Sequence, residues 1–172
     1  MTDGLILKVR DLERRLIRRE RMEIGRQPTY GGISAIGNVT PTAITTAGVA
    51  VQVTIFTTND SSNNTTPDYT NDHITILEAG AYMIVSSITL ESIAGAASQA
   101  EVTVQKNNGT AVVGALHIHR DLSGGGGEAG AMGLSGIATL AVADTIEVWI
   151  ENQTNTQNYV VADITLSVLK VS

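Results

Sequence analysis

The stretch Ile146-Glu147-Val148-Trp149-Ile150-Glu151 decides the fold, because apolar and polar or amphipathic residues alternate in it without a break. Side chains alternate between the two faces of a β-strand, so the three aliphatic residues share one face, while the two glutamates and the tryptophan share the other. We expect the aliphatic face to lie on a core and the other face to point outward.

The same alternation recurs through residues 28–172, and no helical periodicity interrupts it. Turn signals separate the segments, among them Asn108-Gly109, a strong hairpin signal. The pattern predicts an all-β protein, an antiparallel jelly-roll sandwich of eight to ten strands. We predict strands at Val49–Thr58, His73–Glu78, Tyr82–Leu90, Glu101–Lys106, Ala111–Arg120, Gly133–Val142, Ile146–Asn152 and Tyr159–Val171, with an edge strand near Ile33–Val39.

The N-terminal segment has a different composition. It is rich in Leu, Arg and Glu, which predicts an α-helix from Leu5 to about Ile24. Spacings of four, three and four residues are typical of a short coiled-coil seam, formed by Leu5, Val9, Leu12 and Leu16. The alternative is a single helix that packs on the β-domain. The run Gly25–Gly32 contains Pro28 and ends the helix, so we predict a helical stem at residues 1–27 and a β-sandwich knob at residues 28–172.

Charge divides the chain at the same place. The stem has eight basic and five acidic residues, a net charge of +3, whereas the knob has three basic and twelve acidic residues, a net charge of −9. We interpret the stem as an attachment segment for an acidic protein surface, with the anchoring residues Arg14, Arg15, Arg18 and Arg19. Nucleic acid is not an expected partner, because the stem lacks stacking aromatics.

Some function classes are disfavoured by composition. The chain has no cysteine, which excludes disulfides and thiolate chemistry. No run approaches the roughly 18 apolar residues of a membrane-spanning helix, and the N-terminus does not resemble a secretory signal, so we expect no membrane insertion. Three histidines without a nucleophile and base at a known spacing predict a protein that is not an enzyme and has no cofactor.

Four segments resemble the globular domain shared by complement-component, tumour-necrosis-factor and spore-surface knobs. They are Glu78–Tyr82 with the strand that follows it, Val102–Gly109, Leu134–Val148 and Asp163–Val171. The sequence departs from the usual pattern at Ala143, where the family usually has glycine before the aspartate. The resemblance implies a jelly roll that assembles as a compact homotrimer, with a turn at the glycine of the first segment and a buried tyrosine after it.

A cysteine-free chain with a short basic stem and a small knob also resembles bacteriophage head fibres, capsid decorations and short tail fibres. This resemblance implies a virion structural protein at the virion surface, with other virion proteins as partners through the stem and a host glycan as a further candidate partner. The alternative is a soluble carbohydrate- or receptor-binding module of bacterial origin.

Two constellations are candidate ligand sites in the knob. The long polar loop from residue 59 to residue 72 offers oxygens for calcium or for a sugar, and Tyr69 offers a stacking surface. Its candidate residues are Asn59, Asp60, Asp68, Tyr69 and Asp72. His117 and His119 share one face of a strand, where they either hold a metal ion at a threefold axis or simply face solvent; we expect no metal.

Overall fold

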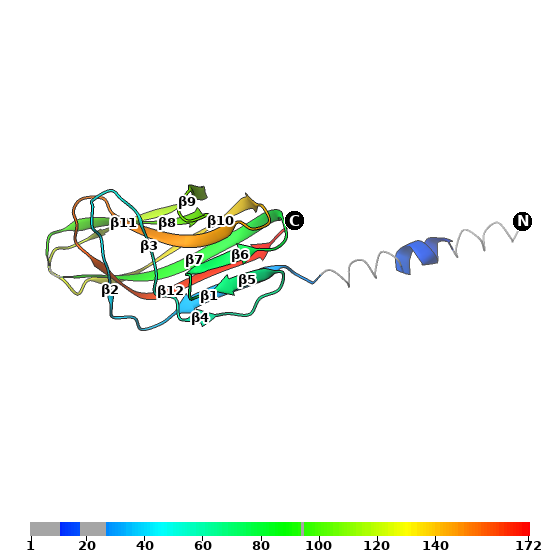
Figure 1. Cartoon of the computed structure of the whole chain (residues 1–172), viewed down its shortest axis with the longest axis horizontal. Coiled ribbons are helices and arrows are strands. Elements are labelled where there is room, and N and C mark those ends of the chain that lie inside the picture. Colours follow the sequence, from blue (N-terminus) through cyan, green and yellow to red (C-terminus); the bar gives the residue numbers. More distant parts are fainter. Residues whose placement is uncertain (1–10, 18–26, 94) are drawn as a thin grey trace, which may run out of the picture.

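The computed structural model describes residues 11–17, 27–93 and 95–172. Residues 11–17 are helical, and the knob is built from strands (Figure 1). The strands are β1 (Tyr30–Ala35), β2 (Pro41–Thr42), β3 (Val51–Gln52), β4 (Thr58–Asn59), β5 (Thr65–Asp68), β6 (His73–Ile76), β7 (Gly80–Ser92), β8 (Ser98–Lys106), β9 (Ala111–Leu122), β10 (Ala129–Leu140), β11 (Thr145–Asn152) and β12 (Tyr159–Lys170).

Two antiparallel sheets form the predicted sandwich. Sheet 1 has the order β10-β7-β12-β1-β4, with β2 beside β12, and sheet 2 has the order β5-β6-β11-β8-β9, with β3 beside β11. The core between them is aliphatic apart from a few aromatic rings, and both Tyr82 and Tyr159 are fully buried. The predicted fold class is therefore confirmed, although β2, β3 and β4 have only two residues each.

The predicted strand Val49–Thr58 is wrong as a single element, because this segment crosses from one sheet to the other. Its first part pairs with β11 of sheet 2, and β4 pairs with β1 of sheet 1. Val53 and Phe56, three residues apart, are buried between the two pairings, so the segment stays against the core while its hydrogen-bond partners change. The edge strand predicted near Ile33–Val39 is β1, which begins earlier, at Tyr30, and lies between β12 and β4 and not at the edge of sheet 1. It ends at Ala35, before Gly37, which has a φ of 72°.

One unpredicted strand lies in the long polar loop. β5 pairs with β6 over four residues, from Thr65 opposite Ile76 to Asp68 opposite His73. The sequence around it is rich in asparagine and contains a proline, which is typical of a loop, so no strand was predicted there. As an edge strand of sheet 2, β5 can contain Pro67 without loss of a ladder hydrogen bond.

Two turns follow the pattern that the resemblance implied. Asn108 and Gly109 both have positive φ, as does Asn107, in the four-residue turn that joins β8 to β9. Ala143 also has a positive φ of 70°, in the place where glycine is usual. Its neighbour Asp144 closes this turn by accepting a hydrogen bond from Ala141 N at 3.0 Å, and it pairs with Lys106 at 3.2 Å.

Candidate functional site

The outward face of sheet 1 contains rows of uncharged side chains that the strand register assembles. β10, β7, β12 and β1 place Ile137, Met83, Leu169 and Tyr30 side by side in one row. Ile137 is 64% exposed, and Met83 and Leu169 are also exposed. An exposed row of large apolar side chains indicates a contact surface.

Further rows on this face consist of uncharged side chains, most of them small. Ser135, Val85 and Ser167 form the second row, and Gly133, Ser87 and Thr165 form the third row. A hollow of about 490 Å³ lies over Met83, Val85 and Leu169, bordered by Tyr30 and Asp60. We call this surface, from the apolar row to the third row, the sheet 1 face. It has the composition of an interface in which protein surfaces approach closely.

Sequence reasoning missed the sheet 1 face. A signal was present in the alternation of Tyr82–Leu90, which puts Met83 and Val85 on the opposite side of the strand from the buried Tyr82. What the sequence did not show was that β10 and β12 flank β7, because this order follows from long-range pairing.

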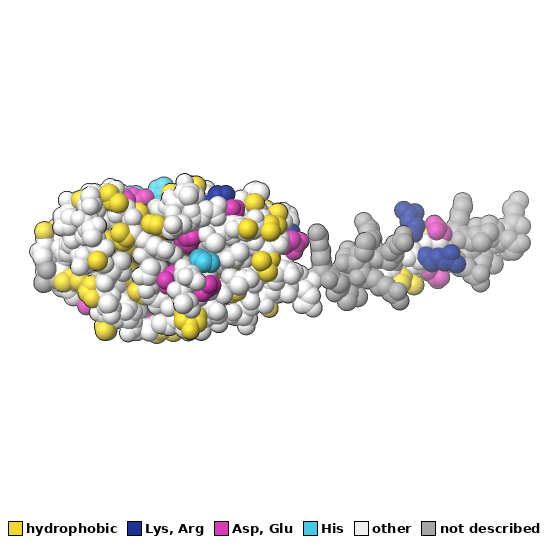
Figure 2. Space-filling model, viewed as in Figure 1, with side chains coloured by type: hydrophobic (Ala, Val, Ile, Leu, Met, Phe, Trp, Pro, Cys, Tyr) yellow, Lys and Arg dark blue, Asp and Glu magenta, His cyan; other side chains and the backbone are white. Residues whose placement is uncertain are grey.

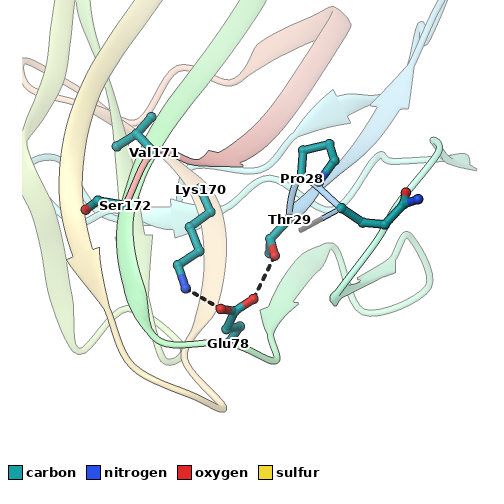
Figure 3. Close-up of a pocket in the computed structure, with 7 residues that line it drawn as sticks. Pro28, Thr29, Glu78, Lys170, Val171 and Ser172 are labelled. Atoms are coloured by element: carbon teal, nitrogen blue, oxygen red, sulfur yellow. Dashed lines mark hydrogen bonds and ion pairs between the residues drawn. The ribbon is translucent and has the colours of Figure 1, made fainter. Parts of the chain in front are cut away.

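The stem joins the knob at the same end as the apolar row. The carboxylate of Glu78 accepts a hydrogen bond from Thr29 Oγ1 at 2.9 Å and pairs with Lys170 Nζ at 2.6 Å (Figure 3). A pocket of about 190 Å³ beside them is lined by residues 27–29 and by the C-terminal residues 170–172. Glu78 thus links Thr29, near the start of the knob, to Lys170 at the end of β12.

Gly80 and Tyr82 complete this junction. The resemblance implied a turn at Gly80, but the structure gives a packing reason for the glycine, because a Cβ there would lie 2.3 Å from Lys170 Cε. Tyr82 is buried as the resemblance implied, and its hydroxyl donates to the carbonyl oxygen of Glu78 at 2.6 Å. Burial raises the pKa of Tyr82.

The described part of the stem exposes its leucines. Leu12 is 62% exposed and Leu16 is 59% exposed, so neither packs on the knob, and Arg14 and Arg15 are exposed as well. Figure 2 shows basic side chains on this helix and very few on the visible face of the knob. The other predicted seam and anchor residues, Leu5, Val9, Arg18 and Arg19, lie outside the described residues. The coiled coil and the anchoring role stay predictions.

The first two residues of the candidate ligand loop use side-chain oxygens in hydrogen bonds within the knob. Asn59 Oδ1 accepts a hydrogen bond from the backbone N–H of Tyr69 at 2.8 Å. Asp60 Oδ1 accepts one from Ser34 Oγ at 3.0 Å, which places this carboxylate beside sheet 1.

Its remaining carboxylates are also engaged. Asp68 Oδ1 accepts from the backbone N–H groups of Thr70 and Asn71 at 3.0 and 3.2 Å. The side-chain amide of Asn71, more than any other group, holds the pKa of Asp68 below its usual value. Asp72 is buried, and its carboxylate accepts from Phe56 N at 3.1 Å. The structure therefore does not bring the predicted loop oxygens together, and a calcium or sugar site there stays a prediction.

The two histidines of β9 lie on the outward face of sheet 2, with ring centroids 5.5 Å apart. His119 Nε2 is 3.8 Å from Glu101 Oε2. Within residues 11–17, 27–93 and 95–172, no three His, Asp or Glu side chains are placed to hold a metal ion. The histidines belong to sheet 2 and are not part of the sheet 1 face.

No family model and no curated protein matches the chain. Solved structures do match, among them the Eiger TNF of S. frugiperda, with 13% identity and a TM-score of 0.58 over 86% of this chain and 94% of that one. Murine APRIL matches with 12% identity and a TM-score of 0.56 over 84% of this chain and all of that one. No helix of the described segments is long and apolar enough to cross a membrane. The knob has a tumour-necrosis-factor-like jelly-roll fold.

Proposed function

We propose that the chain is a bacteriophage virion structural protein, a homotrimeric knob that a basic N-terminal stem attaches to the particle as a head fibre, capsid decoration or short tail fibre. It is not an enzyme, and it works at the virion surface as a mechanical and adhesive element. The sheet 1 face is the observation that carries the homotrimer, and the basic, leucine-exposing stem supports the attachment.

The chemistry of the sheet 1 face supports self-association. Its three rows contain no charged side chain, so burial would leave no unpaired ion. Small residues such as Gly133 and Ser135 let a neighbouring backbone approach closely. β9 and β10 are edge strands of twelve residues each, and a neighbour packed on them would protect their unpaired backbone groups.

The test of the homotrimer is mass in solution by light scattering, on the full chain and on residues 28–172. We expect three protomers in both. Met83→Glu puts a charge in the centre of the apolar row and should give folded monomers with unchanged far-ultraviolet circular dichroism. The matched control is Val49→Glu, because Val49 is exposed but lies outside this face. A monomeric parent protein, or a trimeric Met83→Glu variant, would contradict the proposal.

The virion role has its own test. The full chain should be found by mass spectrometry in purified particles of the phage that encodes it. Residues 28–172 should stay folded but no longer bind particles that lack the protein, and replacing Arg14, Arg15, Arg18 and Arg19 with glutamine should weaken binding of the full chain. A truncated knob that still attaches would refute the stem's role, whatever the number of protomers.

A further inference from the structure

The outward face of sheet 2 contains a second surface with a different chemistry. Strand register places His119, Glu101 and Glu151 directly opposite one another on β9, β8 and β11. The adjacent row contains Trp149, the only tryptophan of the chain. We call the surface formed by Trp149, Glu101, Glu151 and His119 the tryptophan face.

Two like charges face each other at the centre of this surface. The side-chain amide of Gln153 donates to both Glu101 and Glu151. Burial, followed by the negative charge of Glu101, raises the pKa of Glu151. Like charges directly opposite on neighbouring strands destabilise a sheet. The arrangement is therefore a cost to the folded knob that a cation would relieve.

The knob has no lysine or arginine left for this role. Residues 28–172 contain only three such residues, and each is paired with an acid elsewhere. These pairs are Lys106 with Asp144, Arg120 with Glu128, and Lys170 with Glu78. Within the knob, only His119, 3.8 Å from Glu101, could place a positive charge beside these carboxylates, and only when it is protonated. A permanent cation for the tryptophan face would come from outside the knob.

Trp149 is held in one orientation beside the carboxylates. Its indole N–H donates to Glu147 Oε2 at 3.1 Å, and Glu147 is only 2% exposed. Along the benzo ring next to this N–H, a Cβ on Gly109 would lie 2.8 Å from Trp149 Cη2, so the turn at Gly109 packs directly against the ring. The side chain remains partly exposed, and Glu151 follows two residues later on the same face, about 7 Å along the strand.

A fixed indole next to two carboxylates suits a guanidinium group. The planar guanidinium stacks on aromatic faces and forms paired hydrogen bonds with carboxylates. The chain supplies such groups in its stem, which has eight of the eleven basic residues, against a knob of net charge −9. Arg14 and Arg15 are exposed on the described helix and available for this contact.

We propose that the tryptophan face binds the arginine-rich stem of a second copy of this chain. The contact joins the knob of one copy to the stem of another, and it competes with attachment of the stem to any other acidic surface. It does not rest on the proposed trimer or on the virion role, because it uses the opposite sheet and needs only two copies.

Trp149 itself reports on the contact. A peptide of residues 10–21 is titrated into the full chain, and tryptophan fluorescence is followed at low and high salt. We expect a saturable change, weaker binding at high salt because exposed charges are screened, and no change with a peptide whose six arginines are replaced by glutamine. The double variant Glu101→Gln/Glu151→Gln should bind about tenfold more weakly, as expected for two exposed ion pairs.

The matched control is Glu91→Gln/Asp163→Gln, which removes two carboxylates from sheet 1 strands and should leave binding unchanged. Glu101→Gln/Glu151→Gln removes a repulsion, so its thermal melt should not fall, and lost binding cannot be ascribed to unfolding. Equal binding of the glutamine peptide, equal binding by the double variant, or no fluorescence change would overturn the proposal. So would saturable binding of a neutral hexasaccharide with no response to the arginine peptide, since the face would then be a sugar site.

Discussion

Replacement of Asp72 by asparagine should stabilise the knob at neutral pH and not at acid pH. Asp72 is 7% exposed, and burial raises the pKa of its carboxyl from 3.8 to about 6. A raised pKa means that the folded protein favours the protonated acid. The stabilisation of the folded state that protonated Asp72 provides is fully present below pH 3.8 and is lost as the pH rises through 6.

The magnitude follows from a rise of about two pKa units, at about 1.4 kcal/mol for each unit. Ionised Asp72 therefore costs the native state up to about 3 kcal/mol at pH 8. Asparagine cannot ionise, keeps an oxygen that accepts from Phe56 N, and tolerates the positive φ of 56° at this position. The gain from Asp72→Asn should grow from less than about 1 kcal/mol at pH 4 to about 3 kcal/mol at pH 8.

The assay is urea unfolding at several pH values and one fixed protein concentration, followed by tryptophan fluorescence and circular dichroism. Asp68→Asn is the control from the same loop. The pKa of Asp68 is lowered by its hydrogen bonds, so its contribution is present above pH 3.8 and lost at acid pH, and this variant should lose stability at neutral pH. A difference between Asp72→Asn and the parent protein that does not change with pH would refute the argument.

Three substitutions at turns and close contacts have expected outcomes as well. Ala143→Gly should raise the free energy of unfolding by about 0.5–1 kcal/mol in urea, because it removes a left-handed alanine; no gain would mean that the turn is unstrained. Gly109→Ala should lower it by about 1–3 kcal/mol and shift the emission of Trp149, whose ring lies where the new methyl group would be. Gly80→Ala should displace Lys170 and lower the melting temperature, and an unchanged melt would show that this side chain moves aside freely.

The long strands could be predicted from the sequence because each has its core on one side. In β7, buried residues alternate with more exposed ones from Tyr82 to Ser92, and the same period is visible in the amino acids themselves. The hairpin at Asn108-Gly109 was also local information, since both residues favour the positive φ that the turn requires.

Elements that depend on distant partners could not be predicted in this way. β5 exists because β6 pairs with it, and the segment after Val51 changes sheets because β11 and β1 offer partners in different layers. The sheet 1 face and the tryptophan face also depend on pairing between distant segments. Met83 and Leu169 are far apart in the sequence, as are Glu101 and Glu151, and only the strand register makes them neighbours.

The register also indicates which part of the molecule would drive the proposed assembly. The described stem exposes Leu12 and Leu16 on a short helix, and isolated helices of that length are marginal in water. Thr29, near the start of the knob, lies next to the apolar row that contains Leu169. Protomers that meet through the sheet 1 face near this row would hold their stems at a high effective concentration, which converts a weak helix association into an intramolecular one. On this argument the stem peptide alone should stay monomeric, while residues 28–172 should keep the oligomeric state of the full chain.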